Sequence, residues 1–272
     1  MLGSTLAGPM VLAGAVAIGA TVAVERFGAR TGGLLATLPT TVVPAGWGMY
    51  AGAEDLVAFG DAMGAVPVGM LVNAIFLWTW RVLPPRLPQG SLGERLGAMI
   101  VGSLITWGLL AAGATLALAQ ARRLGLSVPT VGTLALAFAV LVGVWAARGA
   151  PRGATARGQV PLPALLARGV MAALAIGGAT TLAGSGAPLL AGMASVFPAI
   201  FLTTMVSLWW SHGDAVPSGA VGPMILGSAA VSAYALVAVW TLPAWGVGVG
   251  SVAAWGLAVG LVTLPAWAWL RR

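Results

Sequence analysis

Cysteine and lysine are absent from this chain of 272 residues, and charged residues of any kind make up only 7% of it. The missing cysteine excludes a disulfide framework and thiolate chemistry. The shortage of charge excludes a water-soluble globule of this size, because too little polar surface is available to cover it. Since 59% of the residues are hydrophobic and the mean hydropathy is +0.98, the sequence predicts an integral membrane protein.

Long apolar runs fill most of the chain. Runs of about 20 residues are long enough for helices that cross a hydrocarbon core of ~30 Å, whereas the strands of a barrel would show short alternating segments. The sequence therefore predicts an all-α, polytopic membrane protein with about nine transmembrane helices. The predicted spans are residues 5–24, 32–52, 56–81, 96–119, 128–147, 161–183, 187–210, 216–241 and 246–270.

The positive charge is carried by thirteen arginines that lie at the ends of the apolar runs. That placement favours membrane anchoring over binding of a nucleic acid. With nine alternating spans, eleven arginines, Arg168 among them, fall on one side, and only Arg122 and Arg123 fall on the other. Because positive charge accumulates on the cytoplasmic side, we expect a bacterial inner (cytoplasmic) membrane protein with its N-terminus outside and its C-terminus in the cytoplasm.

Short motifs recur in the same order in the two halves of the chain. The pattern GSxxxWGL occurs at 102–109 and again at 250–257, and Gly60-Asp61-Ala62 recurs as Gly213-Asp214-Ala215. Spans one to four and six to nine are therefore predicted to be two four-helix repeats. Because a single linker helix crosses the membrane between them, the second repeat is inverted, an architecture typical of secondary transporters. The predicted units are residues 1–120, the linker 121–158, and 159–272.

Two interrupted stretches occupy corresponding places in the repeats: GGLLATLPTTVVP at 32–44 and APLLAGMASVFPA at 187–199. A proline inside a helix frees backbone carbonyls that need partners in hydrocarbon. Hydroxyl groups can supply those partners within kinked, tightly packed helices. Alternatively, broken helices expose their ends and hydroxyls to a substrate site. The second reading predicts the following substrate-binding residues: Thr37, Thr40, Thr41, Pro44, Asn73, Ser195, Pro198, Thr203 and Thr204.

Several polar residues have two readings. Asn73, the single asparagine, is either a link between helices or a substrate ligand. Asp61 and Asp214 are either helix N-caps or coupling and gating groups that take up protons or pair with arginines. Asp55 is expected to be a loop charge, and Trp107 either packs across the repeats or stacks on a substrate.

The stretch LLAGMASVFPAIFLTTM at 189–205 resembles the GlpM-like family of small four-helix inner-membrane proteins, in which a Gly-Leu-rich start leads to Phe-Pro and an apolar run. GGLLATLPTTVVPAGWGMY at 32–50 is a looser match, with Val43-Pro44 in place of Phe-Pro. The resemblance covers about 40 residues in each half. It implies a fused, inverted duplication of a small unit and a link to exopolysaccharide production.

An enzymatic function is not expected. The single histidine, His212, excludes a multi-histidine metal site. Nine spans place Ser185 and His212 on opposite faces and separate Asp61 from Asp214 in the same way, which excludes a nucleophile–base pair and a carboxylate pair. A Gly-rich phosphate loop with lysine is also missing, which argues against nucleotide-driven pumping. No metal and no cofactor are predicted.

The predicted function is that of a secondary transporter or facilitator, which moves a small or lipid-linked solute by alternating access of the two inverted repeats. The alternative is a non-transporting scaffold subunit in envelope or exopolysaccharide assembly. No charge is expected deep within a span, so the sequence does not select the charge of the solute. The expected partners are membrane lipid and the unidentified substrate, with no nucleic acid and with a homodimer left open.

Overall fold

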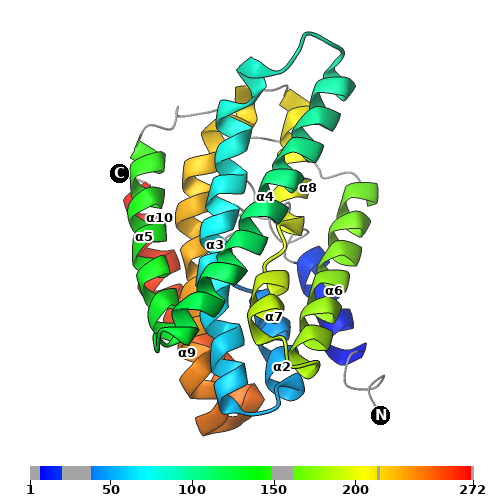
Figure 1. The fold of residues 1–272 in the computed structure, drawn as a ribbon. Helices are drawn as coiled ribbons and strands as arrows, with labels where there is room; N and C mark the ends of the chain where they lie inside the picture. Colours follow the sequence, from blue (N-terminus) through cyan, green and yellow to red (C-terminus); the bar gives the residue numbers. More distant parts are fainter. Residues whose placement is uncertain (1–6, 20–37, 149–161, 213–214, 271–272) are drawn as a thin grey trace.

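The structure is a computed structural model that describes residues 7–19, 38–148, 162–212 and 215–270. Every regular element in these ranges is a helix, which confirms the all-α class (Figure 1). The elements are Ala7–Gly19, α2 (Val42–Gly52), α3 (Leu56–Val82), the short η1 (Pro84–Arg86), α4 (Leu92–Arg123), α5 (Val128–Arg148), α6 (Leu162–Gly184), α7 (Pro188–Ser195), α8 (Ala199–His212), α9 (Ala215–Ala258), the π-helical η2 (Val259–Thr263) and α10 (Leu264–Leu270).

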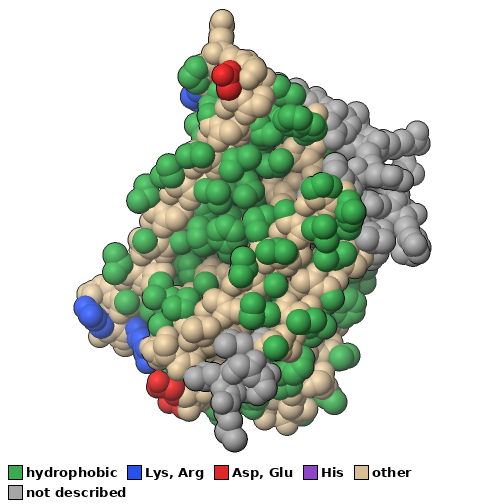
Figure 2. Space-filling model, turned by 90° about the vertical axis from the view of Figure 1, so that its right-hand side faces the viewer, with side chains coloured by type: hydrophobic (Ala, Val, Ile, Leu, Met, Phe, Trp, Pro, Cys, Tyr) green, Lys and Arg blue, Asp and Glu red, His purple; other side chains and the backbone are tan. Residues whose placement is uncertain are grey.

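Six helical runs of the described residues are long and apolar enough to cross a membrane. The chain is therefore an integral membrane protein with several spans, as its composition predicts. Hydrophobic side chains cover the middle of the face in Figure 2, and charged side chains lie toward its two ends. Such a surface suits lipid around the middle and water at both ends.

The longest run, Ala220–Leu270, has 51 residues, but it does not form one straight helix. Gly246 has φ 73° and ψ 170°, a conformation that favours glycine, and the chain reverses there. The reversal brings the Thr241 hydroxyl within 2.9 Å of the Gly250 carbonyl oxygen, to which it donates a hydrogen bond. Nine residues of straight helix would separate these groups by ~13 Å. The run is thus a helical hairpin, divided where the sequence predicts separate spans 216–241 and 246–270.

Helix α3 lies at the centre of the bundle (Figure 1), and 78% of its most apolar stretch is buried, against 22% for α4. The buried side of α3 packs against α9, α5, α7 and α4. Helix α4 instead directs Ile105, Leu109 and Leu116 outward, each more than half exposed. Exposed leucines in such a row are expected on a lipid-facing helix.

The predicted linker helix, α5, packs against both α3 and α9 on one side, and its other side stays exposed. Glycines make this close packing possible. A Cβ atom on Gly143 of α5 would lie 2.7 Å from the Cα atom of Leu226 of α9. One on Gly132 would overlap the carbonyl oxygen of Gly64 on α3. Small residues at such contacts let helix backbones approach closely, as is usual in membrane proteins.

Candidate functional site

A break divides the apolar run Pro188–Trp210 into α7 and α8, with Val196, Phe197 and Pro198 between them. Val196 leaves helical geometry at φ −108° and ψ 23°. The sequence explains the position, because Pro198 lacks an N–H donor and disfavours helical geometry in the residue before it. The predicted interruption of span 187–210 is thus present, and Pro198 lies at it.

The carbonyl oxygens freed at the break have partners. Ser195 donates its hydroxyl to the Gly192 carbonyl at 2.7 Å, a bond within its own helix. The backbone N–H groups of Val196 and Phe197 bond to the carbonyls of Met193 and Ala194. The Val196 carbonyl accepts a hydrogen bond of 2.8 Å from the side chain of Asn73. The break is therefore stabilised by local bonds and by one residue from a distant part of the chain.

Asn73 uses both ends of its amide and is only 2% exposed. Its Nδ2 atom donates to Val196, and its Oδ1 atom accepts a hydrogen bond of 2.8 Å from Nε1 of Trp107 on α4. The Trp107 ring also packs edge-on against Phe197, with centroids 5.2 Å apart. Asn73 and Trp107 thus join α3 and α4 to the break, in agreement with the interpretation of Asn73 as a link between helices. A role in substrate binding stays a prediction.

A buried cation lies beside the first turns of α8. Arg168, on α6, is 7% exposed. Its Nε atom donates to the Thr203 hydroxyl at 2.9 Å, and its Nη2 atom donates to the Thr204 hydroxyl at 3.0 Å. Thr203 in turn bonds to the carbonyl of Ala199, the first residue of α8. Two predicted site residues therefore meet a side chain that the sequence analysis did not include in the site.

The treatment of Arg168 as only an anchoring charge was incomplete, because its side chain is buried against α8 and bonds to Thr203. Arg168 falls inside the apolar run Leu165–Gly184. An arginine near the start of an apolar run reads as an interfacial anchor in the sequence alone. Its burial depends on α8 packing against α6, which local sequence does not reveal.

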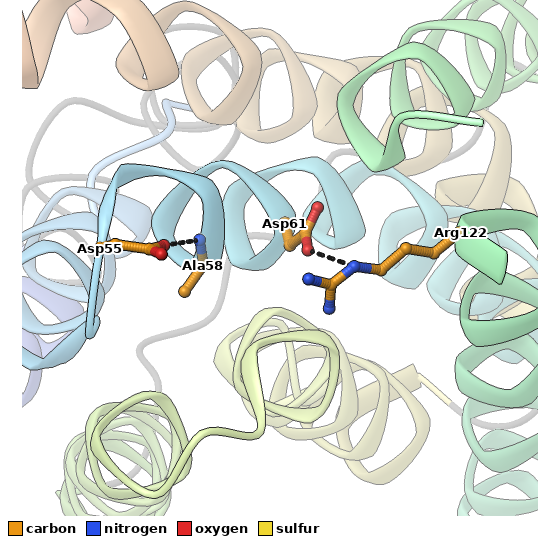
Figure 3. Close-up of polar contacts among 4 residues, drawn as sticks. All are labelled: Asp55, Ala58, Asp61 and Arg122. Carbon is orange, nitrogen blue, oxygen red and sulfur yellow. Dashed lines mark hydrogen bonds and ion pairs between the residues drawn. The ribbon is translucent and has the colours of Figure 1, made fainter. Parts of the chain in front are cut away.

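A second buried charge, Asp61 on α3, faces the last turn of α4 (Figure 3). It is 6% exposed, and its Oδ2 atom lies 3.1 Å from Nε of Arg122, although the contact lacks the alignment of a hydrogen bond. The Arg122 side chain is 52% exposed. Asp61 therefore takes part in an ion pair that reaches the surface, as in the predicted pairing of an acidic residue with an arginine.

The N-cap reading of Asp61 was wrong, because α3 begins five residues earlier, at Leu56. The N-cap is Asp55, whose side chain accepts a hydrogen bond of 2.7 Å from the backbone N–H of Ala58 (Figure 3). The expectation that Asp55 is only a loop charge was therefore wrong as well. A carboxylate at this position satisfies a backbone donor that the first turn of a helix leaves unpaired.

A shallow depression of about 430 Å³ lies beside the ion pair. It is lined by Ala119, Arg122 and Arg123 of α4 and by Leu189 of α7. Its two arginines make it positively charged, and Leu189 places it against the first turn of the broken helix. Among the described residues, no group of three histidine, aspartate or glutamate side chains could hold a metal ion.

The first interrupted stretch is described from residue 38 onward. Residues 38–41 are not helical, α2 begins at Val42, and Thr41 makes no side-chain cap bond. Pro44 lies in the first turn of α2, where a missing N–H costs no helical hydrogen bond, so Pro44 does not itself break this helix. Thr40 lies in the non-helical segment 38–41 that precedes α2. Thr37 and Asp214 lie outside the described residues.

No protein-family model, curated protein or solved structure matches this chain. The GlpM-like resemblance, the count of nine spans and the inverted repeats therefore stay predictions. The argument for function comes from the broken helix α7–α8, its partners Asn73 and Trp107, the buried Arg168, and the Asp61–Arg122 ion pair.

Proposed function

We propose that the chain is a membrane transporter or facilitator whose solute passes the break between α7 and α8. The observation that carries the proposal is the non-helical segment Val196–Pro198 within the 23-residue apolar run Pro188–Trp210. An unbroken helix of that length would already cross a bilayer, so the break is not needed for spanning. Interrupted helices inside a membrane bundle are characteristic of solute sites in secondary transporters.

Contacts between predicted counterparts support two inverted repeats in this transporter. Helix Ala7–Gly19 packs closely against its predicted counterpart, α6. At this contact a Cβ atom added to Gly14 would lie 3.2 Å from the carbonyl oxygen of Gly169 on α6. Helix α2 touches α7, and α3 packs along α9. In two units related by an axis in the membrane plane, helices near the axis touch their own counterparts. The repeats supply the second state of an alternating-access cycle, because each unit can exchange conformation with the other.

The break would act as the hinge of that cycle. Val196 is held by Asn73 and Phe197 by Trp107, so α8 can tilt against α7 only if these contacts change. The Asn73 amide is hydrogen-bonded at both ends to other parts of the protein. This also fits the alternative function, a rigid scaffold subunit in envelope assembly, because the amide then only holds helices together. Only a transporter moves a solute across the membrane, so a measurement of solute uptake distinguishes the two functions.

The test is uptake into proteoliposomes that contain the purified chain. A defined mixture of sugars, polyols, carboxylic acids and inorganic phosphate is added outside, and the lumen is assayed by mass spectrometry. We expect protein-dependent entry of at least one solute, and severalfold slower entry with Pro198→Ala, which lets α7 and α8 join. The matched control is Pro88→Ala, since Pro88 is an exposed loop proline.

Two outcomes contradict the proposal. One is a folded, monodisperse protein through which no solute of the mixture enters, a result that favours the scaffold. The other is a Pro198→Ala variant as active as the parent chain, which would show that the break has no part in the solute path. Folding of both variants is checked by circular dichroism and by thermal unfolding in detergent.

A further inference from the structure

We infer that transport by this chain is coupled to protons and that Asp61 is the residue that binds the proton. The inference rests on the proposed transport function and adds the ion that drives it. Asp61 lies on α3, in an apolar run long enough to cross a membrane, and it is only 6% exposed. An acidic residue in such a position is costly to bury, and in membrane proteins it commonly belongs to a proton relay or an ion path.

The charge of the Asp61 carboxylate is compensated incompletely. Its Oδ2 atom is buried and accepts no hydrogen bond among the described residues. Nε of Arg122 lies 3.1 Å away without the alignment of a hydrogen bond, and the Arg122 side chain is 52% exposed (Figure 3). If Arg122 moves away, the carboxylate must take up a proton, because a lone buried charge is far more costly than a neutral acid.

The local geometry favours a proton over a metal cation. Sodium sites in transporters use backbone carbonyls of unwound helices. Helix α3 continues from Leu56 to Val82, so the carbonyls around Asp61 are engaged in its own hydrogen bonds. The guanidinium of Arg122 also occupies the place beside the carboxylate where a cation would bind. A proton needs neither free carbonyls nor space.

Other charged and titratable side chains at this end of α3 come from four parts of the chain. Helix α7 has none, Arg148 of α5 lies at the opposite end of its helix from Gly132, which packs on α3, and Arg168 of α6 bonds to α8. Arg122 is the partner that contacts Asp61 within the described residues. The neighbouring groups are Arg122 and Arg123 of α4, Glu54 and Asp55 before α3, Tyr50 of α2, which packs on Phe59, and Tyr234 of α9, which bonds to Ser251.

Protonation and opening of the ion pair are one step. A hydronium ion in the depression beside Arg122 gives its proton to Oδ2 and leaves as water, and an O–H bond forms on the carboxylate. Asp61 is then neutral, and Arg122 keeps its charge and turns toward water from the exposed part of its side chain. The pair therefore opens when Asp61 takes a proton and closes when Asp61 releases it.

One row of side chains on α3 connects the ion pair to the broken helix. A spacing of four residues places the row along one ridge of the helix. Its members are Asp61, Ala65, Gly69 and Asn73. A Cβ atom on Gly192 of α7 would lie 2.8 Å from that of Ala65, and one on Gly69 would overlap a methyl group of Val196. Since Asn73 bonds to the Val196 carbonyl, movement of α3 at the pair reaches the break through direct contacts.

The first test detects the proton without any solute. Purified full-length protein in phosphatidylcholine bilayers is compared in mildly alkaline and mildly acidic buffer by infrared difference spectroscopy. On acidification we expect the carbonyl-stretch band of a buried carboxylic acid. The band should be absent in Asp61→Asn and unchanged in Glu54→Gln, at an exposed carboxylate. In Arg122→Gln it should already be present in the alkaline buffer, because the charged form has lost its partner.

Thermal unfolding gives a second readout that does not depend on the band. Arg122→Gln makes the charged form of Asp61 costly but leaves the neutral form unaffected, so its loss of Tm relative to the parent chain should be large in alkaline buffer and severalfold smaller in acidic buffer. The double variant Asp61→Asn/Arg122→Gln should not show this pH dependence. A parent chain without the infrared band, a band that persists in Asp61→Asn, or a loss of Tm independent of pH would each overturn the inference.

Transport and proton coupling fail in different ways. In the proteoliposome assay, a buffer more acidic outside than inside should make solute entry severalfold faster, and a protonophore should abolish the difference. Asp61→Asn should not respond to the gradient, whereas Glu54→Gln should respond like the parent chain. If no solute enters, the proposed function fails and the coupling with it, whatever the infrared band shows. If a solute enters at a rate that the pH gradient does not change, or that only a sodium gradient raises, transport stands and proton coupling falls.

Discussion

The side chain of Asn73 on α3 donates a 2.8 Å hydrogen bond to the carbonyl oxygen of Val196, the residue that follows the end of α7 and lies 123 positions away. Without this bond the carbonyl would lack a partner inside an apolar bundle, where water is not at hand. The single asparagine of the chain therefore stabilises the broken apolar run Pro188–Trp210. Trp107 completes the arrangement by bonding to the other end of the amide.

Replacing Asn73 with leucine should destabilise the protein and loosen the break. The change removes one hydrogen bond to Val196 and one from Trp107, and it leaves a buried carbonyl and a buried indole N–H unpaired. Each buried group left unpaired costs ~1–3 kcal/mol. Thermal unfolding in detergent should show a clear fall in Tm, whereas Gln89→Ala, an exposed amide in a loop, should leave Tm unchanged. Equal Tm values for the two variants would contradict the role of Asn73.

Tight packing between α7 and α3 predicts a strong effect at Gly192. A Cβ atom there would overlap the carbonyl oxygen of Ala62, so Gly192→Leu must push the two helices apart. Overpacking of this kind costs ~1–3 kcal/mol or more. The matched control is Gly108→Leu on α4, because no atom of another helix in the described part of the chain lies within 4 Å of the Cβ position there. Unfolding in detergent should separate the two variants; a Gly108→Leu protein as unstable as Gly192→Leu would show that leucine itself, rather than the contact, is responsible.

The Asp61–Arg122 ion pair predicts an asymmetric response to removal of its partners. Asp61 is buried and Arg122 is half exposed. Arg122→Gln leaves an uncompensated carboxylate in the interior, whereas Asp61→Asn leaves an arginine that can turn toward water. Arg122→Gln should therefore lower Tm more than Asp61→Asn does.

A double-mutant cycle measures the coupling of the pair directly. Because Arg122 reaches the surface, the interaction energy should stay near the range of exposed pairs, ~0.2–1 kcal/mol, and should fall at high salt. Arg123→Gln, at the neighbouring exposed arginine, is the control and should show no coupling with Asp61→Asn. Coupling of equal size at Arg123 would mean that Asp61 senses the general charge of this end of α4 and not Arg122 in particular.

Hydropathy was enough to predict where most helices lie. The predicted span 128–147 is helix α5, Val128–Arg148, and 56–81 is α3, Leu56–Val82. Both depend on an apolar run with turn residues or charges at its ends, which is local information. The interruption near Pro198 was predicted for the same reason, because a proline acts on its own helix.

The errors concern contacts between distant segments. Arg168 looks like an anchor until α8 is placed against α6, and Asp61 looks like a cap until α3 is known to begin at Leu56, with Asp55 as its N-cap. The partner of Asn73 is a backbone carbonyl, which leaves no mark in the sequence. Buried polar pairs are set by tertiary packing, so a single sequence reveals that a polar residue needs a partner but not which partner it has.

The hairpin at Gly246 and the crossing of α4 predict which loops share a side of the membrane. Leu126 follows α4 and Trp245 precedes the reversal, and both are more than half exposed. The turn between α4 and α5 and the reversal within α9 lie at the same end of the bundle (Figure 1). Gln89 belongs to the connection between α3 and α4, which lies at the opposite end of the bundle. Because the chain has no cysteine, Gln89→Cys, Leu126→Cys and Trp245→Cys each carry one thiol, and the parent chain is an unlabelled control. In intact cells a membrane-impermeant maleimide should label the thiols at 126 and 245, and the thiol at 89 only after permeabilisation, since the positive-inside rule predicts that Gln89 faces the cytoplasm. Labelling of 89 and 126 alike would rule out a membrane-crossing α4, and opposite labelling of 126 and 245 would rule out the reversal at Gly246.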